Sequence, residues 1–261
     1  MQKETIIKVI EDFVLTSEQN SYQGQYRFYD RPLVGFAAAD DPIFMEFKKE
    51  EIVGPNFRLP TEWLPSAKTV ISFFLPSSEY VRKSNYDDGF MSDAWIHARF
   101  LGEDFIFELR RHVIAFLEKH GAKAMAPVLD PGFKIENSWI SNWSERHVAY
   151  AAGLGTFSLN RGMITKKGIA GRFGSVITDL AFEATTRPYS DPFAYCTFCQ
   201  ACAKRCPAKA ITEAGHEKKI CFEYLIDKSR PDYNKELAHY PYPACGKCQT
   251  KVPCEKSIPQ K

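Results

Sequence analysis

Apolar residues recur at helical spacing in three stretches of the chain. Residues 3–14, 93–119 and 138–152 each carry such a stripe, so we expect three helices. The longest should be interrupted near Gly102 and end at Gly121, because glycine weakens a helix interior and favours a C-terminal cap. Shorter helices are expected at residues 40–50 and 207–213.

Other stretches have the composition of strands. Residues 69–75 form an unbroken run rich in β-branched and aromatic side chains, which is typical of a buried strand. Further strands are expected at residues 33–37, 123–128, 162–165 and 172–180, and a basic, glycine-rich turn joins the last two. Because helices and strands follow one another in no regular order, the pattern predicts an α+β fold for this part of the chain.

Composition and charge narrow the class of protein. The 261 residues are 44% hydrophobic and 25% charged, and the net charge of +2 gives no sign of a polyanionic partner. There is no run of about 18 apolar residues, so no membrane span is expected. The N-terminus lacks the basic start and apolar core of a signal peptide. The sequence therefore predicts a cytoplasmic protein.

The cysteines carry the clearest chemical signal. None of the eight lies before Cys196. The first four form the run Cys-x2-Cys-x2-Cys-x3-Cys-Pro, which is typical of bacterial two-cluster ferredoxins. Eight thiolates suffice for two [4Fe–4S] clusters at four ligands each. The change in cysteine usage predicts two domains, at residues 1–186 and 187–261.

The motif also predicts how the thiols are shared. The cysteine before the proline ligates the other cluster in two-cluster proteins. Cys196, Cys199 and Cys202 should therefore share one cluster with a late cysteine, for which Cys254 is the candidate, and Cys206 would join Cys221, Cys245 and Cys248 on the other. The Cys-x2-Cys pairs would also suit zinc knuckles, but the combined run favours iron and sulfide. Disulfides are disfavoured in a cytosolic chain.

One segment resembles a known family. Residues 145–155 read Glu-Arg-His-Val-Ala-Tyr-Ala-Ala-Gly-Leu-Gly. They resemble the Glu-Arg…Ala-Gly-Leu-Gly segment of epoxyqueuosine reductases, which are cobalamin-dependent iron–sulfur enzymes of tRNA queuosine synthesis. Reductive dehalogenases share the Ala-Gly-Leu-Gly block. Residues 174–180, 221–225 and 245–249 resemble later blocks of the same family, so the likeness covers roughly residues 65–254.

The resemblance implies a fold and cofactors. It implies a nitroreductase-like α+β domain that binds cobalamin, followed by a ferredoxin-like domain whose clusters deliver electrons to cobalt. An external low-potential donor such as ferredoxin or flavodoxin would reduce the clusters. The cobalamin-binding residues carried over from the resemblance are Gly153, Leu154, Gly155, Asn160, Arg172, Gly174 and Ser175. Glycine suits such a site because it lets the backbone approach a large flat ring.

The sequence departs from the family at two points. Trp139 stands where epoxyqueuosine reductases have a proton-donating aspartate, and the chain lacks the C-terminal helical repeats that help to hold tRNA. A small-molecule or nucleotide substrate is therefore left open, and tRNA is possible but not supported. Candidate catalytic groups are Asp130, Glu145 and Tyr150, although each also has an ordinary reading as a turn residue, a helix-face charge or a core aromatic.

The sequence thus predicts an oxidoreductase that passes single electrons through two [4Fe–4S] clusters to a corrinoid. An alternative is a non-catalytic electron-transfer or corrinoid-handling module that serves a partner enzyme. A third reading is a flavin enzyme, because nitroreductase-like folds often hold FMN.

Overall fold

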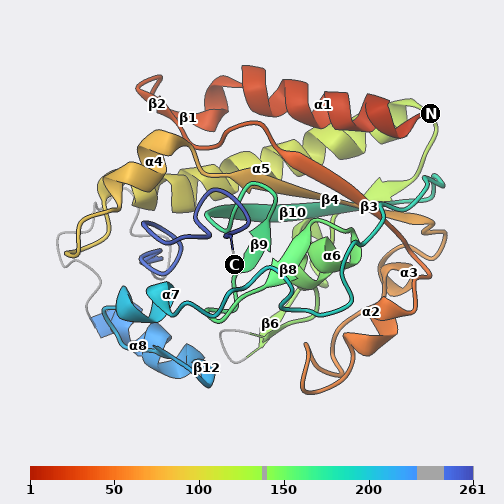
Figure 1. Ribbon diagram of the computed structural model, residues 1–261. Helices are drawn as coiled ribbons and strands as arrows, with labels where there is room; N and C mark the ends of the chain where they lie inside the picture. The colour runs from red at the N-terminus through yellow and green to blue at the C-terminus, as the bar shows by residue number, and fades with distance from the viewer. Residues whose placement is uncertain (137–139, 228–243, 261) are drawn as a thin grey trace.

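A four-stranded antiparallel sheet forms the centre of the computed structural model, which describes residues 1–136, 140–227 and 244–260. The strands lie in the order β3 (Leu33–Ala38), β4 (Thr69–Pro76), β10 (Gly171–Thr178) and β5 (Ala124–Met125) (Figure 1). Every residue of β4 is buried. The strands expected at 33–37 and 69–75 are confirmed, and the fold mixes helices with an antiparallel sheet as expected.

Helices cover both faces of this sheet (Figure 1). On one face α5 (Asp93–Lys119) packs on β10, and α1 (Lys3–Thr16) packs on α5. On the other face α6 (Glu145–Ala151) packs on β4 and β10. The apolar stripes of these helices, such as Ile6, Ile10 and Val14 of α1, are buried.

Helix α5 continues through Gly102, so the predicted interruption is wrong. A Cβ atom at Gly102 would lie 2.5 Å from the hydroxyl oxygen of Tyr29. That hydroxyl donates a hydrogen bond of 2.9 Å to the carbonyl oxygen of Ala98. Glycine at position 102 leaves room for the buried Tyr29 ring to pack against the helix, and it does not end the helix.

The helix predicted at 138–152 begins later than expected, at Glu145. Residues Ile140–Ser141 form β7, which pairs with β6 (Ile135–Glu136). The Asn142 side-chain oxygen accepts a hydrogen bond from the Lys134 amide and helps to close this hairpin. Strand pairing therefore outweighs the helical spacing of the apolar residues before Glu145. Trp139 lies outside the described residues.

The strands predicted at 162–165 and 172–180 exist as β9 (Met163–Thr165) and β10, but they do not pair with each other. Strand β9 pairs with β8 (Gly155–Phe157), and β10 pairs with β4 and β5. The C-terminal segment accounts for this, because the Ile169 and Ala170 amides donate to the carbonyl oxygens of Cys254 and Glu255. The turn at residues 166–171 therefore contacts the C-terminal segment, and the expected hairpin is wrong.

Among its described residues, the cysteine-rich part contains only short elements. Its helices are α7 (Ala201–Lys204), inside the cysteine run, and α8 (Lys218–Asp227), and between them lie strands β11 (Ile211–Thr212) and β12 (Gly215–His216). The helix predicted at 207–213 is wrong. The Lys209 amide donates to the Cys206 carbonyl, and Lys209 adopts a φ of 51°, which turns the chain away from helical geometry.

The remaining elements are short. Helix α2 occupies part of the expected helix at 40–50, and the strand expected at 123–128 shortens to β5 followed by a 3-10 turn. The Asp41 carboxylate accepts a hydrogen bond from the Ile43 amide at the start of α2. These elements are η1 (Glu18–Asn20), β1 (Ser21–Tyr22), β2 (Tyr26–Arg27), α2 (Ile43–Glu46), α3 (Pro60–Trp63), α4 (Glu79–Ser84) and η2 (Pro127–Leu129).

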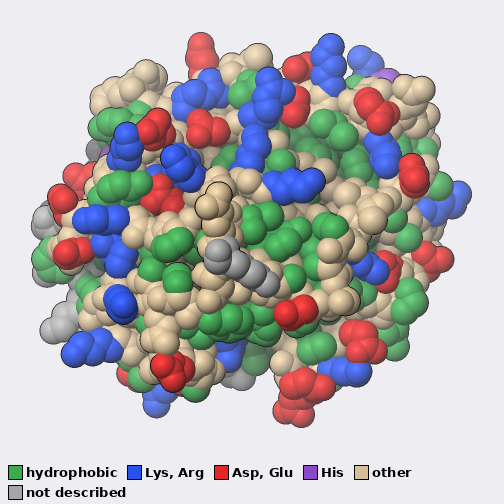
Figure 2. All heavy atoms as spheres, viewed as in Figure 1, with side chains coloured by type: hydrophobic (Ala, Val, Ile, Leu, Met, Phe, Trp, Pro, Cys, Tyr) green, Lys and Arg blue, Asp and Glu red, His purple; other side chains and the backbone are tan. Residues whose placement is uncertain are grey.

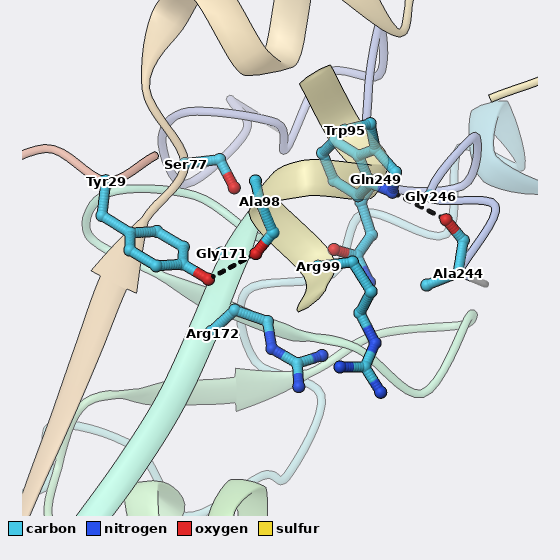
Figure 3. Close-up of a pocket in the computed structure, with 10 residues that line it drawn as sticks. All are labelled: Tyr29, Ser77, Trp95, Ala98, Arg99, Gly171, Arg172, Ala244, Gly246 and Gln249. Atoms are coloured by element: carbon cyan, nitrogen blue, oxygen red, sulfur yellow. Dashed lines mark hydrogen bonds between the residues drawn. The ribbon is translucent and has the colours of Figure 1, made fainter. Parts of the chain in front are cut away.

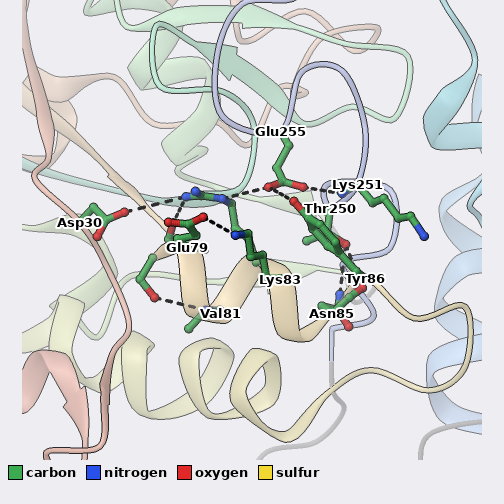
Figure 4. A network of polar contacts seen from close by, with 12 residues as sticks. Asp30, Glu79, Val81, Lys83, Asn85, Tyr86, Thr250, Lys251 and Glu255 are labelled. Atoms are coloured by element: carbon green, nitrogen blue, oxygen red, sulfur yellow. Dashed lines mark hydrogen bonds and ion pairs between the residues drawn. The ribbon is translucent and has the colours of Figure 1, made fainter.

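A buried carboxylate fastens the C-terminal segment to α4. Glu255 accepts hydrogen bonds from Arg82 Nε at 3.0 Å, the Tyr86 hydroxyl at 2.9 Å and the Lys251 amide (Figure 4). Its side chain is 7% exposed. This contact fixes Cys254 relative to the sheet.

The surface shows no large region of one charge on the face viewed in Figure 2, where basic and acidic side chains are interspersed. No helix among the described residues is long and apolar enough to cross a membrane.

Candidate functional site

Four cysteines line a small cavity beside β9, which we call the first thiol cavity. They are Cys196, Cys199, Cys202 and Cys254. Apolar side chains such as Ile164, Phe198 and Val252 complete the wall. In the described part of the chain, no charged side chain lines this cavity. Cys199 and Phe198 are exposed, so the cavity lies close to the surface.

The other four cysteines line a separate cavity of about 360 Å³, the second thiol cavity. They are Cys206, Cys221, Cys245 and Cys248. Its wall also includes Arg146, Arg161, His216 and Lys218, and no acidic side chain from the described residues. The two cavities therefore hold equal numbers of thiols but differ in charge.

Burial and neighbouring thiols shift the pKa of several of these cysteines. Burial, and then the neighbouring thiols, raise the pKa of Cys221 to about 11. Burial and Cys202, Cys196 and Cys199 raise the pKa of Cys254 to about 12. A bound cation would reverse these shifts by stabilising the thiolates.

The thiols surround cavities and do not converge on one point. Among residues 1–136, 140–227 and 244–260, no three His, Cys, Asp or Glu side chains lie together as ligands of a single metal ion. Each cavity offers four thiols, and four is the number of thiolates that one [4Fe–4S] cluster takes, so the donor sets fit such a cluster.

Asn160 lies between the two thiol cavities and lines both. Its side-chain nitrogen donates to the carbonyl oxygen of Cys248 at 2.7 Å. Its side-chain oxygen accepts from the Ser158 hydroxyl and the Gly162 amide. All these bonds fix a buried side chain beside the cysteine loops.

A third cavity, of about 580 Å³, opens beside the sheet, and we call it the arginine cavity. Its volume is in the range of small-molecule and cofactor sites. Aromatic side chains from several elements line one part of it, namely Phe107, Phe133, Trp143 and Phe173. Six charged side chains line another part, namely Arg99, Glu103, Arg110, Glu145, Arg146 and Arg172.

The arginine cavity shares wall residues with its neighbours. It shares Arg146, Gly162 and Gln249 with the second thiol cavity. It also shares Arg99 and Arg172 with the smaller pocket of Figure 3, where the two guanidinium groups point to the same side. The four thiols of the second thiol cavity thus lie across a shared wall from the arginine cavity, whose volume suits a cofactor.

Trp95 holds the loop that forms this shared wall. Its ring nitrogen donates to the Ala244 carbonyl at 2.9 Å (Figure 3). Gly246 packs against the ring, where a Cβ atom would lie only 2.1 Å away, and its φ is +67°. A glycine is required here on both counts. The contact positions Cys245 and Cys248 against α5.

Glu103 organises the charges of the arginine cavity. It pairs with Arg172, with Arg99 at 3.7 Å and with Arg110 at 3.8 Å. Burial opposes ionisation of Glu103, but the three guanidinium groups outweigh it and lower the pKa of this carboxyl. Glu145 accepts a hydrogen bond of 3.0 Å from Arg110.

Of the predicted site residues outside the cysteines, Glu145 and Arg172 line the arginine cavity. Ser175 lies behind it and accepts a hydrogen bond of 3.0 Å from Trp143. Leu154 belongs to the core. A Cβ atom at Gly174 would strike the Phe73 ring at 2.5 Å, so this glycine serves packing.

The glycines of the Ala-Gly-Leu-Gly block also serve packing. Gly153 has a φ of +76° and lies against the backbone of Thr186. A Cβ atom at Gly155 would lie 2.1 Å from the Ile164 carbonyl oxygen in β9. Neither lines the three cavities, so a direct contact between these glycines and a cofactor stays a prediction.

Two predicted catalytic groups lie away from the cavities. The Asp130 carboxylate accepts a hydrogen bond from the Gly132 amide in an exposed turn. The Tyr150 hydroxyl donates to the Ser190 carbonyl, and its ring packs against Phe157. A catalytic role for either remains a prediction without support from this geometry.

Sequence reasoning missed the charges that α5 contributes. Arg99, Glu103 and Arg110 lie on one side of that helix. The available signal was Arg110, which falls between the apolar positions Ile106 and Val113 on the core-facing stripe. A charged residue on such a stripe indicates a buried ion pair or a site.

Comparison with solved structures places this architecture. The epoxyqueuosine reductase of Bacillus subtilis superposes with a TM-score of 0.59 over 99% of this chain at 18% identity. That of Streptococcus thermophilus gives 0.55, also at 18% identity. The chain has the fold of the epoxyqueuosine reductases. The predicted likeness is confirmed at the level of the fold.

The reductive dehalogenases share this fold. One, solved to explain B12-dependent dehalogenation, gives a TM-score of 0.55 over 87% of this chain at 14% identity. This chain spans 66% of the Bacillus subtilis reductase and 30% of that dehalogenase. No protein-family model matches the chain, and no curated protein matches its sequence.

Proposed function

We propose that this protein is an oxidoreductase that passes single electrons through two [4Fe–4S] clusters to a bound corrinoid. Residues 1–186 would form a nitroreductase-like, corrinoid-binding domain, and residues 187–261 a ferredoxin-like domain. The observation that carries the proposal is the wall shared by the second thiol cavity and the arginine cavity. It would bring a cluster and a cofactor close enough for electron transfer.

The residues present fit both groups. Each thiol cavity offers four cysteines, in the division that the ferredoxin motif predicts. The arginine cavity offers an aromatic wall for a flat macrocycle, with Trp143 fixed by Ser175. A corrinoid would supply a metal that accepts electrons and reacts with the substrate. The chain's own residues would hold it, exclude water with Phe107 and Phe173, and orient the substrate through the charged side chains.

The order of the cavities suggests a path for electrons. An external low-potential donor such as ferredoxin or flavodoxin would approach the first thiol cavity, where Cys199 and Phe198 are exposed. Asn160 lies between the first and second thiol cavities, and the second adjoins the arginine cavity. This arrangement would lead single electrons from the surface to the cofactor.

The substrate is a separate question. One epoxyqueuosine reductase of this fold is known with an epoxyqueuosine-modified tRNA-Tyr stem loop. Trp139 stands at the position of that family's proton-donating aspartate, so we propose a different small-molecule or nucleotide substrate for this chain. The same departure favours the alternative of an electron-transfer or corrinoid-handling module.

Metal analysis and spectroscopy of the anaerobically purified protein test the proposal. We expect about eight irons and eight sulfides per chain, since each cluster holds four of each. Added cobalamin should bind and show corrin bands that change on reduction of the clusters. Zinc in place of iron, or the absence of corrinoid binding, would refute the proposal, and released flavin would favour the FMN reading. Turnover of a substrate would separate the enzyme from the module.

Matched cysteine variants test the two groups. Cys199→Ser and Cys221→Ser should each lower the iron content by up to half, because each removes a ligand of one cluster only. Electron paramagnetic resonance should show the loss of a different cluster in each. Thr212→Ser, an exposed change in the same segment that keeps its hydroxyl, is the control and should leave iron unchanged. Loss of the same signal in both cysteine variants would contradict the grouping.

A further inference from the structure

The charges around the arginine cavity do not balance. Four arginines line it, but only two carboxylates do, among the residues that the structure describes. Glu103 is shared by three guanidinium groups, and Glu145 pairs with Arg110. These two carboxylates leave an excess of two positive charges facing the cavity.

Arg146 is the cation with the least compensation. Its guanidinium donates to the Arg161 carbonyl at 2.7 Å, and within the described ranges no carboxylate lies at ion-pairing distance from it. Other cations lie near it, because Arg172 lines the arginine cavity with it and Arg161 lines the second thiol cavity with it. Like charges in one cavity repel, so an anion placed among them would be stabilised.

Arg110 and Glu145, on the wall of the arginine cavity, are not fully hydrogen-bonded. The Arg110 side chain is 1% exposed, and its Nε and Nη1 atoms have no hydrogen-bond acceptor among the described residues. One oxygen of Glu145 likewise has no donor there. Buried polar groups are normally satisfied, and exceptions mark incomplete sites. This ion pair thus leaves hydrogen-bonding capacity unused beside the cavity.

The basic side chains around Arg146 could serve only to stabilise the neighbouring thiolates, but they extend beyond the second thiol cavity. Lys218 lines the second thiol cavity and not the arginine cavity, whereas Arg172 and Arg99 line the arginine cavity and not the second thiol cavity. Arg146 lines both. Positive charge therefore continues past the thiols into the space available for a ligand.

We propose that the arginine cavity binds a small organic substrate through an anionic group, a phosphate or a carboxylate, with Arg146 as its main contact and Arg172 beside it. Guanidinium groups suit this task because their fork of N–H donors matches the oxygens of such anions. This inference names the substrate class of the proposed reductase and rests on that proposal for the reaction, but not for the binding.

Calorimetric titration of the cluster-loaded protein with inorganic phosphate and with benzoate tests the proposal at low ionic strength. Arg146→Gln should weaken binding by about tenfold or more, the effect of losing a charge-assisted hydrogen bond, and Arg146→Lys should restore part of it. Arg111→Gln removes the same charge from the outer side of α5, where Arg111 pairs with Glu108, and should leave the affinity unchanged. Equal affinities in Arg146→Gln and Arg111→Gln would overturn the proposal.

Lys218→Gln is the second control, because Lys218 lines only the second thiol cavity. We expect a smaller loss of phosphate affinity than in Arg146→Gln, because Lys218 is near enough to act on the charge of Arg146 but lines no part of the arginine cavity. A loss as large as that of Arg146→Gln would mean that the anion binds among the thiols, and the proposal would be wrong.

The phosphate could also come from the nucleotide loop of cobalamin, and a corrinoid comparison separates the two sources. Cobinamide lacks that phosphate. If phosphate still binds through Arg146 when cobalamin is saturating, the site serves a substrate. If cobalamin displaces phosphate and cobinamide does not, the substrate assignment is overturned. Should no corrinoid bind at all while phosphate binding depends on Arg146, the proposed function fails and the anion site stands.

Discussion

Gly102 in α5 allows a sharp test of how packing overrides helix propensity. Alanine is favoured over glycine in a helix interior by about 1 kcal/mol, so propensity alone predicts that Gly102→Ala stabilises the protein. The structure predicts the opposite. The added Cβ would lie 2.5 Å from the Tyr29 hydroxyl oxygen and 3.0 Å from the ring carbon that bears it.

Tyr29 cannot move aside at low cost, because it is fully buried and donates its hydroxyl to Ala98. Overpacking a core typically costs about 1–3 kcal/mol, and losing the hydrogen bond costs about 1 kcal/mol. After the gain in propensity is subtracted, Gly102→Ala should lower the free energy of unfolding by about 1–3 kcal/mol. Urea unfolding followed by circular dichroism and by fluorescence measures this, provided that the two transitions coincide.

Tyr29→Phe removes the atom that the new methyl group meets first. Gly102→Ala should therefore cost less in a Tyr29→Phe background than in the natural chain, by about 1 kcal/mol or more. The double-mutant cycle isolates the contact between the two side chains. A Gly102→Ala protein that is more stable than the natural one would refute the reasoning, and so would equal costs in both backgrounds.

Three further predictions concern charged side chains. Glu103→Gln should lower the free energy of unfolding at pH 7 by about 3 kcal/mol, because a buried ion pair loses one partner. The pKa of Glu103 is lower in the folded than in the unfolded state, so its stabilisation is present above the unfolded pKa of about 4.3 and is lost as the pH falls through the folded-state pKa. A plot of unfolding free energy against pH should therefore be flatter on its acid side in the variant. Lys218→Gln should lower the reduction potential of the cluster proposed in the second thiol cavity by roughly tens of millivolts, because a nearby positive charge is lost. The potential of the cluster proposed in the first thiol cavity should not change, which a redox titration followed by electron paramagnetic resonance would show. Glu255→Gln should loosen the segment that carries Cys254, so a protease should cleave within residues 244–260 faster than in the natural chain. Glu79→Gln, on the exposed side of α4, is the control and should not change the rate, and equal rates in the two variants would contradict the anchoring role of Glu255.

The long elements of the fold could be predicted because local pattern and tertiary packing agree there. The stripe of α1 faces the core, and the apolar run of β4 is buried on both sides of the sheet. The spacing of the run before Pro207 also predicted that Cys206 faces a different cavity from Cys196, Cys199 and Cys202, and the cavity linings agree with this.

The failures lie where a distant segment decides the local structure. Residues 166–171 read as a hairpin turn, but the amides of Ile169 and Ala170 pair with the C-terminal segment. The helical spacing extends before Glu145, but Ile140 and Ser141 pair with strand β6. No local pattern shows that such a partner exists. The arginine cavity was hidden for the same reason, because α5, α6 and β10 each contribute only part of its charge.

The Ala-Gly-Leu-Gly block shows why a motif can locate a site without touching it. Gly155 lets β8 approach β9 so closely that any side chain would strike the Ile164 carbonyl. That pairing places Asn160, in the loop between the two strands, beside both thiol cavities. Substituting Gly155 by alanine would therefore displace the loop that holds Asn160 against Cys248, and the damage would reach the cysteines through the backbone. A motif of this kind locates the thiol cavities because it positions the backbone that lines them, whether or not its own atoms contact a cofactor.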